Sequence, residues 1–317
     1  MANEFQNRDL FWALRGGGGG SWGVVVNVTL RTFPDPPLVF QSLQLVTPNI
    51  TAFWDFIREF HVKLPAINDA GGSGYYFVQP GTKNQSSTLD IILLFVGQTD
   101  EAPVAKLLDP LIFYANHTIG SSSVVAFRAP LPQSKALIQE VLPAESDNEG
   151  SIVRVGSRLV SRDFLARPGG AARLTETFQA LYAPGGGGGI ITGHIVAGGQ
   201  VASNQALDVA VNPAWRRTVT HLAFGVSWPV DASVVQQRVE ERRLTDVMVP
   251  LFAKLEPDMG AYLNEADARE RNFQTSFWGA NYKRLRRIKD KLDPEGIFIT
   301  NAGVGSEDWG VDGLCRV

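Results

Sequence analysis

Two side chains in the C-terminal half of the sequence could exchange protons with a bound substrate. His194 lies in the apolar segment ITGHIVAGG, and Glu265 ends the tetrapeptide Tyr-Leu-Asn-Glu that begins at Tyr262. An imidazole or a carboxylate serves as a general base when burial or neighbouring charges move its pKa towards the working pH. The alternatives are a hydrogen-bonded structural role for His194 and, for Glu265, a charge at a helix N-terminus or an ion pair with Arg269. The sequence leaves these alternatives open.

A run of five glycines, Gly16 to Gly20, is a second candidate for ligand binding. Glycine loops let a backbone approach a phosphate closely, because glycine has no Cβ and reaches positive φ. The dinucleotide-binding fingerprint requires a strand before the glycines and a helix after them. Here the β-branched run from Val24 to Leu30 follows and predicts a buried strand after the loop. This order does not support a Rossmann unit, and a plain structural loop is the alternative to a ligand site.

The histidines and the cysteine argue against a metal or disulfide framework. His61, His117, His194 and His221 are scattered along the chain and fit no metal-ligand spacing, so the sequence predicts no metal site. Cys315 is the only cysteine, which excludes an internal disulfide and a zinc site built from cysteines.

Charge and hydropathy exclude further classes of partner. The formal net charge of −3 gives no reason to expect nucleic acid or an anionic membrane. No run approaches the roughly 18 apolar residues of a membrane span. Arg158, in GSRLVSR, could bind an anionic substrate, but we expect a surface or capping role for it.

The apolar pattern predicts an α+β fold in which helices cover one face of a mostly antiparallel sheet. A helical turn is expected at residues 9–14, before the glycine run. Polar or glycine-rich loops are expected at 143–150 and 185–189. The predicted strands are 39–46, 75–78, 89–96, 189–197 and 221–228, and the predicted longer helices are 53–60, 102–114, 232–254 and 282–292.

Two segments carry a resemblance to a known family. They are DLFWALRGGGGGSWGVVVNVTLRTFP and, about 240 residues later, YLNEADARERNFQTSFWGANYKRLRRIKDKLDPEGIF. Together they resemble the C-terminal part of berberine-bridge-enzyme-like, FAD-linked oxidases, fungal members above all. The resemblance implies that residues 1–35 end an FAD-binding domain, that 36–260 form a substrate-binding domain with a large antiparallel sheet, and that 261–317 return to the FAD domain.

The same resemblance implies which residues would face the cofactor. In the family, the glycine loop and the strand after it contact FAD, and an Asn-Tyr pair lies near the flavin. For Tyr282 the alternative is a core position on the apolar stripe of a helix. The residues carried over are Gly17, Gly18, Gly19, Ser21, Gly23 and Val24, with Asn281 and Tyr282 as the Asn-Tyr pair.

The implied substrate side contains Tyr262 and Glu265. The family element often reads Tyr-x-Asn-Tyr, and its tyrosines line the substrate side of the flavin, whereas this sequence ends the element with Glu265. This difference offers a carboxylate in place of a tyrosine base. The implied activity is that of an FAD-dependent oxidase acting on a small alcohol, amine or secondary-metabolite C–H donor. Hydride would pass to flavin N5, and O2 would be the acceptor.

The resemblance also implies that the upstream half of the flavin domain is absent from this sequence. The first residues show no signal peptide, although the family is often secreted, so localisation stays open. The strand at 24–30 would lose its sheet neighbours. We expect the chain alone to bind FAD weakly or not at all, and the alternative to an oxidase is a non-catalytic fragment of one.

Overall fold

The computed structural model describes residues 1–137, 152–182, 189–310 and 313–317, and its centre is a seven-stranded antiparallel sheet. In space the strands run in the order β4-β1-β3-β2-β6-β7-β5, and every pair is antiparallel. The predicted α+β class is confirmed. The strands are β1 (Leu38–Thr47), β2 (Gly72–Gln79), β3 (Ser87–Val96), β4 (Val124–Leu131), β5 (Val153–Ser161), β6 (Ile191–Ile195) and β7 (Thr218–Ser227).

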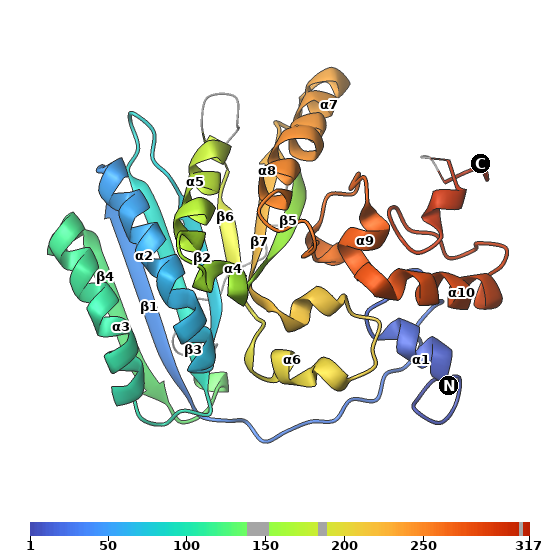
Figure 1. The fold of residues 1–317 in the computed structure, drawn as a ribbon, viewed down its shortest axis with the longest axis horizontal. Coiled ribbons are helices and arrows are strands. Elements are labelled where there is room, and N and C mark those ends of the chain that lie inside the picture. The colour runs from blue at the N-terminus through green and yellow to red at the C-terminus, as the bar shows by residue number, and fades with distance from the viewer. Residues whose placement is uncertain (138–151, 183–188, 311–312) are drawn as a thin grey trace.

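Helices cover one face of this sheet, as Figure 1 shows. The largest is α2 (Ile50–Asp69), whose N-terminus is capped by Asn49, because the Asn49 side chain accepts a hydrogen bond from the amide of Ala52. The other covering helices are α3 (Ala102–Ala115), α5 (Gly170–Tyr182) and α8 (Val249–Ala253), and the short α4 (Arg162–Ala166) follows β5 directly.

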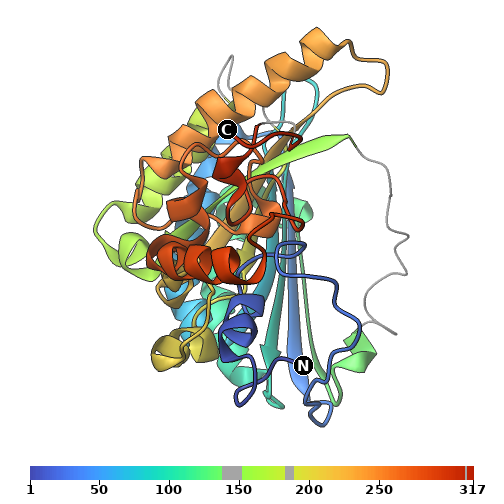
Figure 2. The same ribbon diagram turned by 90° about the vertical axis from the view of Figure 1, so that its right-hand side faces the viewer.

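Side-chain alternation separates the two faces of the sheet. Tyr76 on β2 and Phe224 on β7 point into the main core beneath the helices, where they contact Phe60 and Phe252. Their neighbours along each strand point to the opposite face. In Figure 2 the sheet is seen edge-on, with helices on one side and the blue segment that leads to β1 on the other.

A smaller second core joins the two ends of the chain. It contains α1 (Arg8–Leu14), α9 (Phe273–Trp278) and α10 (Tyr282–Leu292), which lie beside one another at the right of Figure 1. Trp12, Trp278 and Leu285 are its buried centre. The remaining helices, α6 (Gly199–Ser203) and α7 (Val234–Arg243), lie on the surface.

The prediction of a buried strand at 24–30 is wrong. Residues 23–37 form no strand ladder, and the apolar side chains of Val24, Val26 and Leu30 are exposed. An extended segment needs a hydrogen-bonded neighbour to become a strand, and none of the described residues offers one. In Figure 1 this stretch is the thin blue line between α1 and β1.

The other predicted elements are present, although the predicted helix at 232–254 is α7 and α8 joined by a π-helical turn, Leu244–Met248. Strands β4 and β5 and helices α4, α5, α6 and α9 were not predicted. The expected loops at 143–150 and, except for Gly189, at 185–189 lie outside the described residues. In the described part of the chain no helix is long and apolar enough to cross a membrane.

Candidate active site on the open face of the sheet

Two histidines lie side by side on the face of the sheet that the helices do not cover. His194 on β6 and His221 on β7 are direct cross-strand partners, and Tyr75 on β2 is the partner of His194 on its other side. The ring centroids are 4.8 Å apart for the two histidines and 5.1 Å apart for Tyr75 and His194. Antiparallel register therefore sets three rings in a row across three strands.

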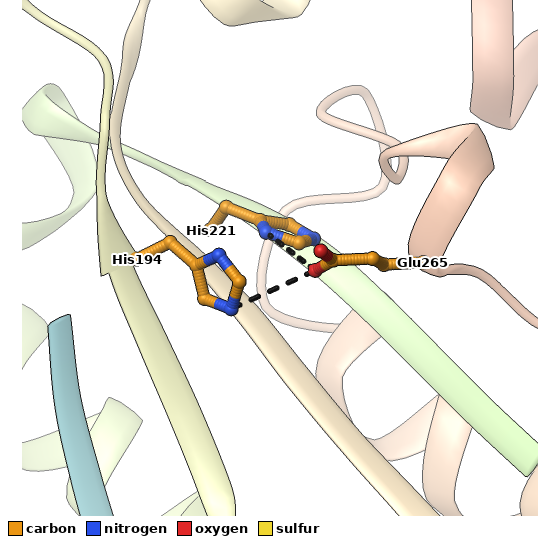
Figure 3. A group of neighbouring side chains, drawn as sticks. All are labelled: His194, His221 and Glu265. Carbon is orange, nitrogen blue, oxygen red and sulfur yellow. Dashed lines mark ion pairs between the residues drawn. The ribbon is translucent and has the colours of Figure 1, made fainter. Parts of the chain in front are cut away.

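Glu265 reaches this row from the C-terminal segment (Figure 3). It ends a short 3-10 turn, Leu263–Glu265. Its Oε2 lies 3.6 Å from Nε2 of His194 and 3.7 Å from Nδ1 of His221, distances too long for hydrogen bonds. Within the described residues, Glu265 Oε2 and His221 Nε2 are buried without a hydrogen-bond partner. The sequence alternative of an ion pair with Arg269 is wrong, because Arg269 pairs with Glu241.

Burial favours the neutral forms of both imidazoles of the cluster. It lowers the pKa of His194, while the charge of Glu265 acts in the opposite direction. Burial, and then the charge of His194, lower the pKa of His221 to about 3. Neutral imidazoles beside a carboxylate can accept protons or coordinate a cation. The side chains are 15% exposed for His194, 1% for His221 and 39% for Glu265, so a ligand can reach His194 and Glu265.

A buried ion pair fixes the segment that carries Glu265. Arg158 on β5 and Glu270 form a two-pronged contact of 3.0 and 2.9 Å, and Ser276 donates a further hydrogen bond to Glu270. The amide of Tyr262 donates to the hydroxyl of Ser157 at 3.3 Å. The expected surface or capping role of Arg158 is wrong, because the C-terminal segment covers it.

A cavity of about 400 Å³ lies next to the cluster. Tyr262 belongs to both, because it lines the cavity and its ring centroid is 5.6 Å from that of His221. No charged side chain of the described residues lines the cavity. The residues that line it include Gly18, Gly19, Gly23, Trp215, Tyr262 and Phe277.

Packing requires glycine at one position of the glycine loop, Gly16, but not at another, Gly19. A Cβ on Gly16 would lie 2.2 Å from the amide nitrogen of Val211 and would also need a φ of +129°. Gly19 has nothing within 4 Å of its Cβ position and has no positive φ, so neither backbone nor packing requires glycine there. A loop that leaves this space open at the cavity lets another group approach its backbone.

The structure brings together only part of the set predicted from sequence. Gly18, Gly19 and Gly23 line the cavity with Tyr262, and His194 and Glu265 form the neighbouring cluster. The remaining cofactor candidates are not among the residues that line this cavity; they are Gly17, Ser21, Val24, Asn281 and Tyr282.

Asn281 and Tyr282 have structural partners instead. The Asn281 amide donates to the carbonyls of Val209 and Val211 at 3.2 and 2.9 Å. The Tyr282 hydroxyl donates to Glu307, and burial, followed by this hydrogen bond, raises the pKa of Tyr282. Tyr282 also packs against Trp278, in agreement with the core alternative for this residue.

His221 and Trp215 were missed at the level of sequence. Spacing along the chain hides a cross-strand pair, so the histidines looked scattered. The available signal was that His194 and His221 both fall within predicted strands, since pairing these strands in the observed register places the two rings together.

Comparisons with known proteins point to flavoproteins. Residues 261–305 match the family described as "Berberine and berberine like". An uncharacterized FAD-linked oxidoreductase of Arthroderma benhamiae is 42% identical over 99% of this chain and 54% of its own length. The FAD-linked oxidoreductase malF of Malbranchea aurantiaca is 36% identical over 99% of this chain and 52% of its own length.

The fold is similar to that of a VAO-type flavoprotein of Myceliophthora thermophila. The TM-score is 0.86 at 26% identity, over 100% of this chain and 57% of that structure. The chain thus spans about half the length of the relatives it matches.

Proposed function

Because this chain belongs to the berberine-like, VAO-type family of FAD-linked oxidoreductases, we propose that it forms the substrate side of an FAD-dependent oxidase site. The observation that carries the proposal is the shared position of Tyr262, which joins the glycine-walled cavity to the cluster of His194, His221 and Glu265. The cavity can receive a flat ring, and the cluster can receive a proton.

The cavity fits the ring system of FAD better than the whole cofactor. Ligand pockets for drug-sized molecules span about 300–1,000 Å³, and this one, at about 400 Å³, is near the lower limit. Its uncharged wall of glycine backbone and aromatic rings suits a neutral planar group. It offers no lysine or arginine to a diphosphate among the described residues. Gly18, Gly19, Gly23 and Tyr262 would hold the ring.

The chemistry that FAD supplies when bound is acceptance of a hydride at N5 and return of the electrons to O2. The chain's own residues would manage the proton. His194 and Glu265 are the more accessible members of the cluster, and the neutral imidazole or the carboxylate can take a proton from a substrate hydroxyl or amine. His221 is buried behind them and limits where Glu265 can lie. The proposed substrate is a small alcohol, amine or secondary-metabolite C–H donor.

A flavin titration tests the proposal on this chain directly. We expect saturable quenching of flavin fluorescence, with similar affinities for FAD and for lumiflavin, which is the ring system alone. Gly19→Leu fills the cavity where the backbone tolerates a side chain, so it should abolish the quenching. Ala180→Leu adds the same bulk on the exposed surface of α5 and serves as the matched control. Equal binding by the wild type and Gly19→Leu, or no saturable quenching at all, would contradict the proposal.

The uncharged cavity favours a second candidate, a chain that supports no turnover by itself. A site that holds only the ring lacks the contacts that a diphosphate needs for tight binding. In that case the titration would show weak ring binding, and reduction of the flavin by substrate alcohols or amines would stay at the rate of free flavin. Faster reduction in the presence of the wild-type chain would exclude this candidate.

A further inference from the structure

The cluster of His194, His221 and Glu265 contains more than proton acceptance requires. Two imidazole nitrogens and one carboxylate oxygen, from two strands and a separate turn, all lie within 4.8 Å of one another. They form no hydrogen bonds among themselves, and Glu265 Oε2 is buried without a hydrogen-bond partner in the described part of the chain. A carboxylate oxygen in this position is costly unless a cation compensates it.

The donor set is the one that transition-metal ions prefer. Neutral imidazole and carboxylate bind zinc, and a site with three protein ligands leaves a fourth position to water or a small ligand. Around an ion at bond lengths of about 2.0–2.1 Å, ligand atoms lie roughly 3.3 Å apart in a tetrahedral arrangement and roughly 3.6 Å apart in a trigonal one. The two distances from Glu265 to the histidines, 3.6 and 3.7 Å, are close to these values.

The widest spacing among the three ligand atoms, 4.8 Å, is not one of the Glu265 distances and therefore separates the two histidine nitrogens, so binding needs the imidazoles to rotate towards each other. His194 and His221 are held on adjacent strands by the sheet register. Glu265 lies on a 3-10 turn with a side chain that is 39% exposed, so it can move towards the histidines without disturbing the core. Figure 3 shows the three side chains pointing to a common point between the sheet and the C-terminal segment.

We propose that His194, His221 and Glu265 form a binding site for one divalent transition-metal ion, with zinc as the best match. The site has one open coordination position on its exposed side. An ion there occupies the groups that would accept the substrate proton, so zinc inhibits turnover; this consequence alone rests on the proposed oxidase function.

Equilibrium dialysis of the untagged chain against Zn²⁺ tests the site without any flavin. We expect one ion per chain and at least about tenfold weaker binding for Glu265→Gln and His194→Asn. His117→Asn should bind zinc like the wild type, because His117 is exposed on the helical side of the molecule and lies outside the cluster. Bound Co²⁺ should show visible d–d absorption bands that disappear in Glu265→Gln.

A thermal melt keeps the test informative if a variant is less stable. We expect zinc to raise the unfolding midpoint of the wild type and of His117→Asn, and to leave that of Glu265→Gln unchanged. Equal zinc affinity of the wild type and Glu265→Gln, or absence of stoichiometric binding, overturns the proposal. These measurements contain no flavin, so a failed flavin titration and a failed metal site are told apart.

Discussion

The two halves of the candidate site come from regions that are held together in different ways. The sheet and its covering helices share one large core in which aromatic and aliphatic side chains such as Phe53, Phe60 and Phe178 are fully buried. The layer formed by both ends of the chain has a much smaller core and contains the buried ion pair Lys289–Asp293, while a second buried pair joins its Glu270 to Arg158 on β5 of the sheet. Apolar burial drives the first region to fold, whereas directional polar contacts position the second.

This difference explains where the cluster lies. The histidines are on strands of the first region, so their positions follow from sheet register. Glu265 belongs to the second region, and the Arg158–Glu270 pair and the Tyr262–Ser157 hydrogen bond hold its segment against β5. The sheet region thus provides the two histidines, whose backbone positions are fixed. The second region provides Glu265, whose side chain can adjust.

The largest effect on stability should come from the core of the first region. Phe60 is fully buried and contacts Tyr76 edge-on at 5.0 Å. Phe60→Ala should lower the free energy of unfolding by about 3–5 kcal/mol, because it removes buried area and leaves a cavity. Urea denaturation measures the change. Phe113→Ala is the control, since Phe113 is 73% exposed and its loss should cost less than about 0.5 kcal/mol.

Breaking the ion pair that joins the second region to β5 should cost somewhat less. Arg158→Met leaves Glu270 buried without its cation and should lower the free energy of unfolding by about 3 kcal/mol. The double variant Arg158→Met/Glu270→Met should recover most of this loss, because no charge is then left unpaired. If the single and double variants unfold at the same urea concentration, the pair does not hold the segment as described.

Acid should weaken the first region through a histidine that the site does not use. His61 lies among Phe60, Tyr76 and Phe178, and burial lowers its pKa to about 3. Between that value and the ordinary pKa of 6.5 the unfolded chain binds more protons, so stability falls as the pH falls. His61 alone should contribute ~1.4 kcal/mol per pH unit well inside this window.

The variant His61→Phe should have a shallower dependence of stability on pH than the wild type. Denaturation midpoints measured from pH 7 to pH 4 give the comparison. Replacing the exposed His117 by Phe is the matched control and should leave the slope unchanged. Identical slopes for the wild type and His61→Phe would show that the buried imidazole is protonated without cost.

The smallest effect on stability is expected in the segment between α1 and β1. Val26 is 93% exposed, and Val26→Ser should change the free energy of unfolding by less than about 0.5 kcal/mol. The same variant should reduce self-association in light scattering, because an unpaired extended apolar segment promotes association between chains. A loss of several kcal/mol would mean that this segment packs on the protein after all.

Most of the sheet could be predicted from sequence, because strands such as β1 alternate apolar and polar residues, and β3 contains a short continuous apolar run. The two missed strands lack that signal. β4 is an edge strand with largely exposed side chains, and β5 contains Ser157 and Arg158, two buried polar residues whose partners Tyr262 and Glu270 lie in the C-terminal segment. For the apolar run 24–30 the error is the opposite one, because a strand was predicted that is not formed. High β propensity does not produce a strand when no neighbouring strand is available for pairing.

The site was predicted only in part, because its assembly also depends on contacts between residues that are distant in sequence. His194 and Glu265 were identified one at a time, from their chemistry and from a family motif. Their association with each other and with His221 depends on strand register and on a contact between residues that are distant in sequence. The local sequence pattern contains no information about strand register or about such contacts.

Histidine NMR during a lumiflavin titration tests the central claim that the cavity and the cluster form one site. The chain has four histidines, and His61 and His117 serve as internal controls. We expect the ring resonances of His221 and His194 to shift in a saturable way, because Tyr262 links them to the cavity, while those of His61 and His117 stay unchanged. Saturable flavin binding that moves none of the four resonances, or moves all of them equally, would contradict a shared site.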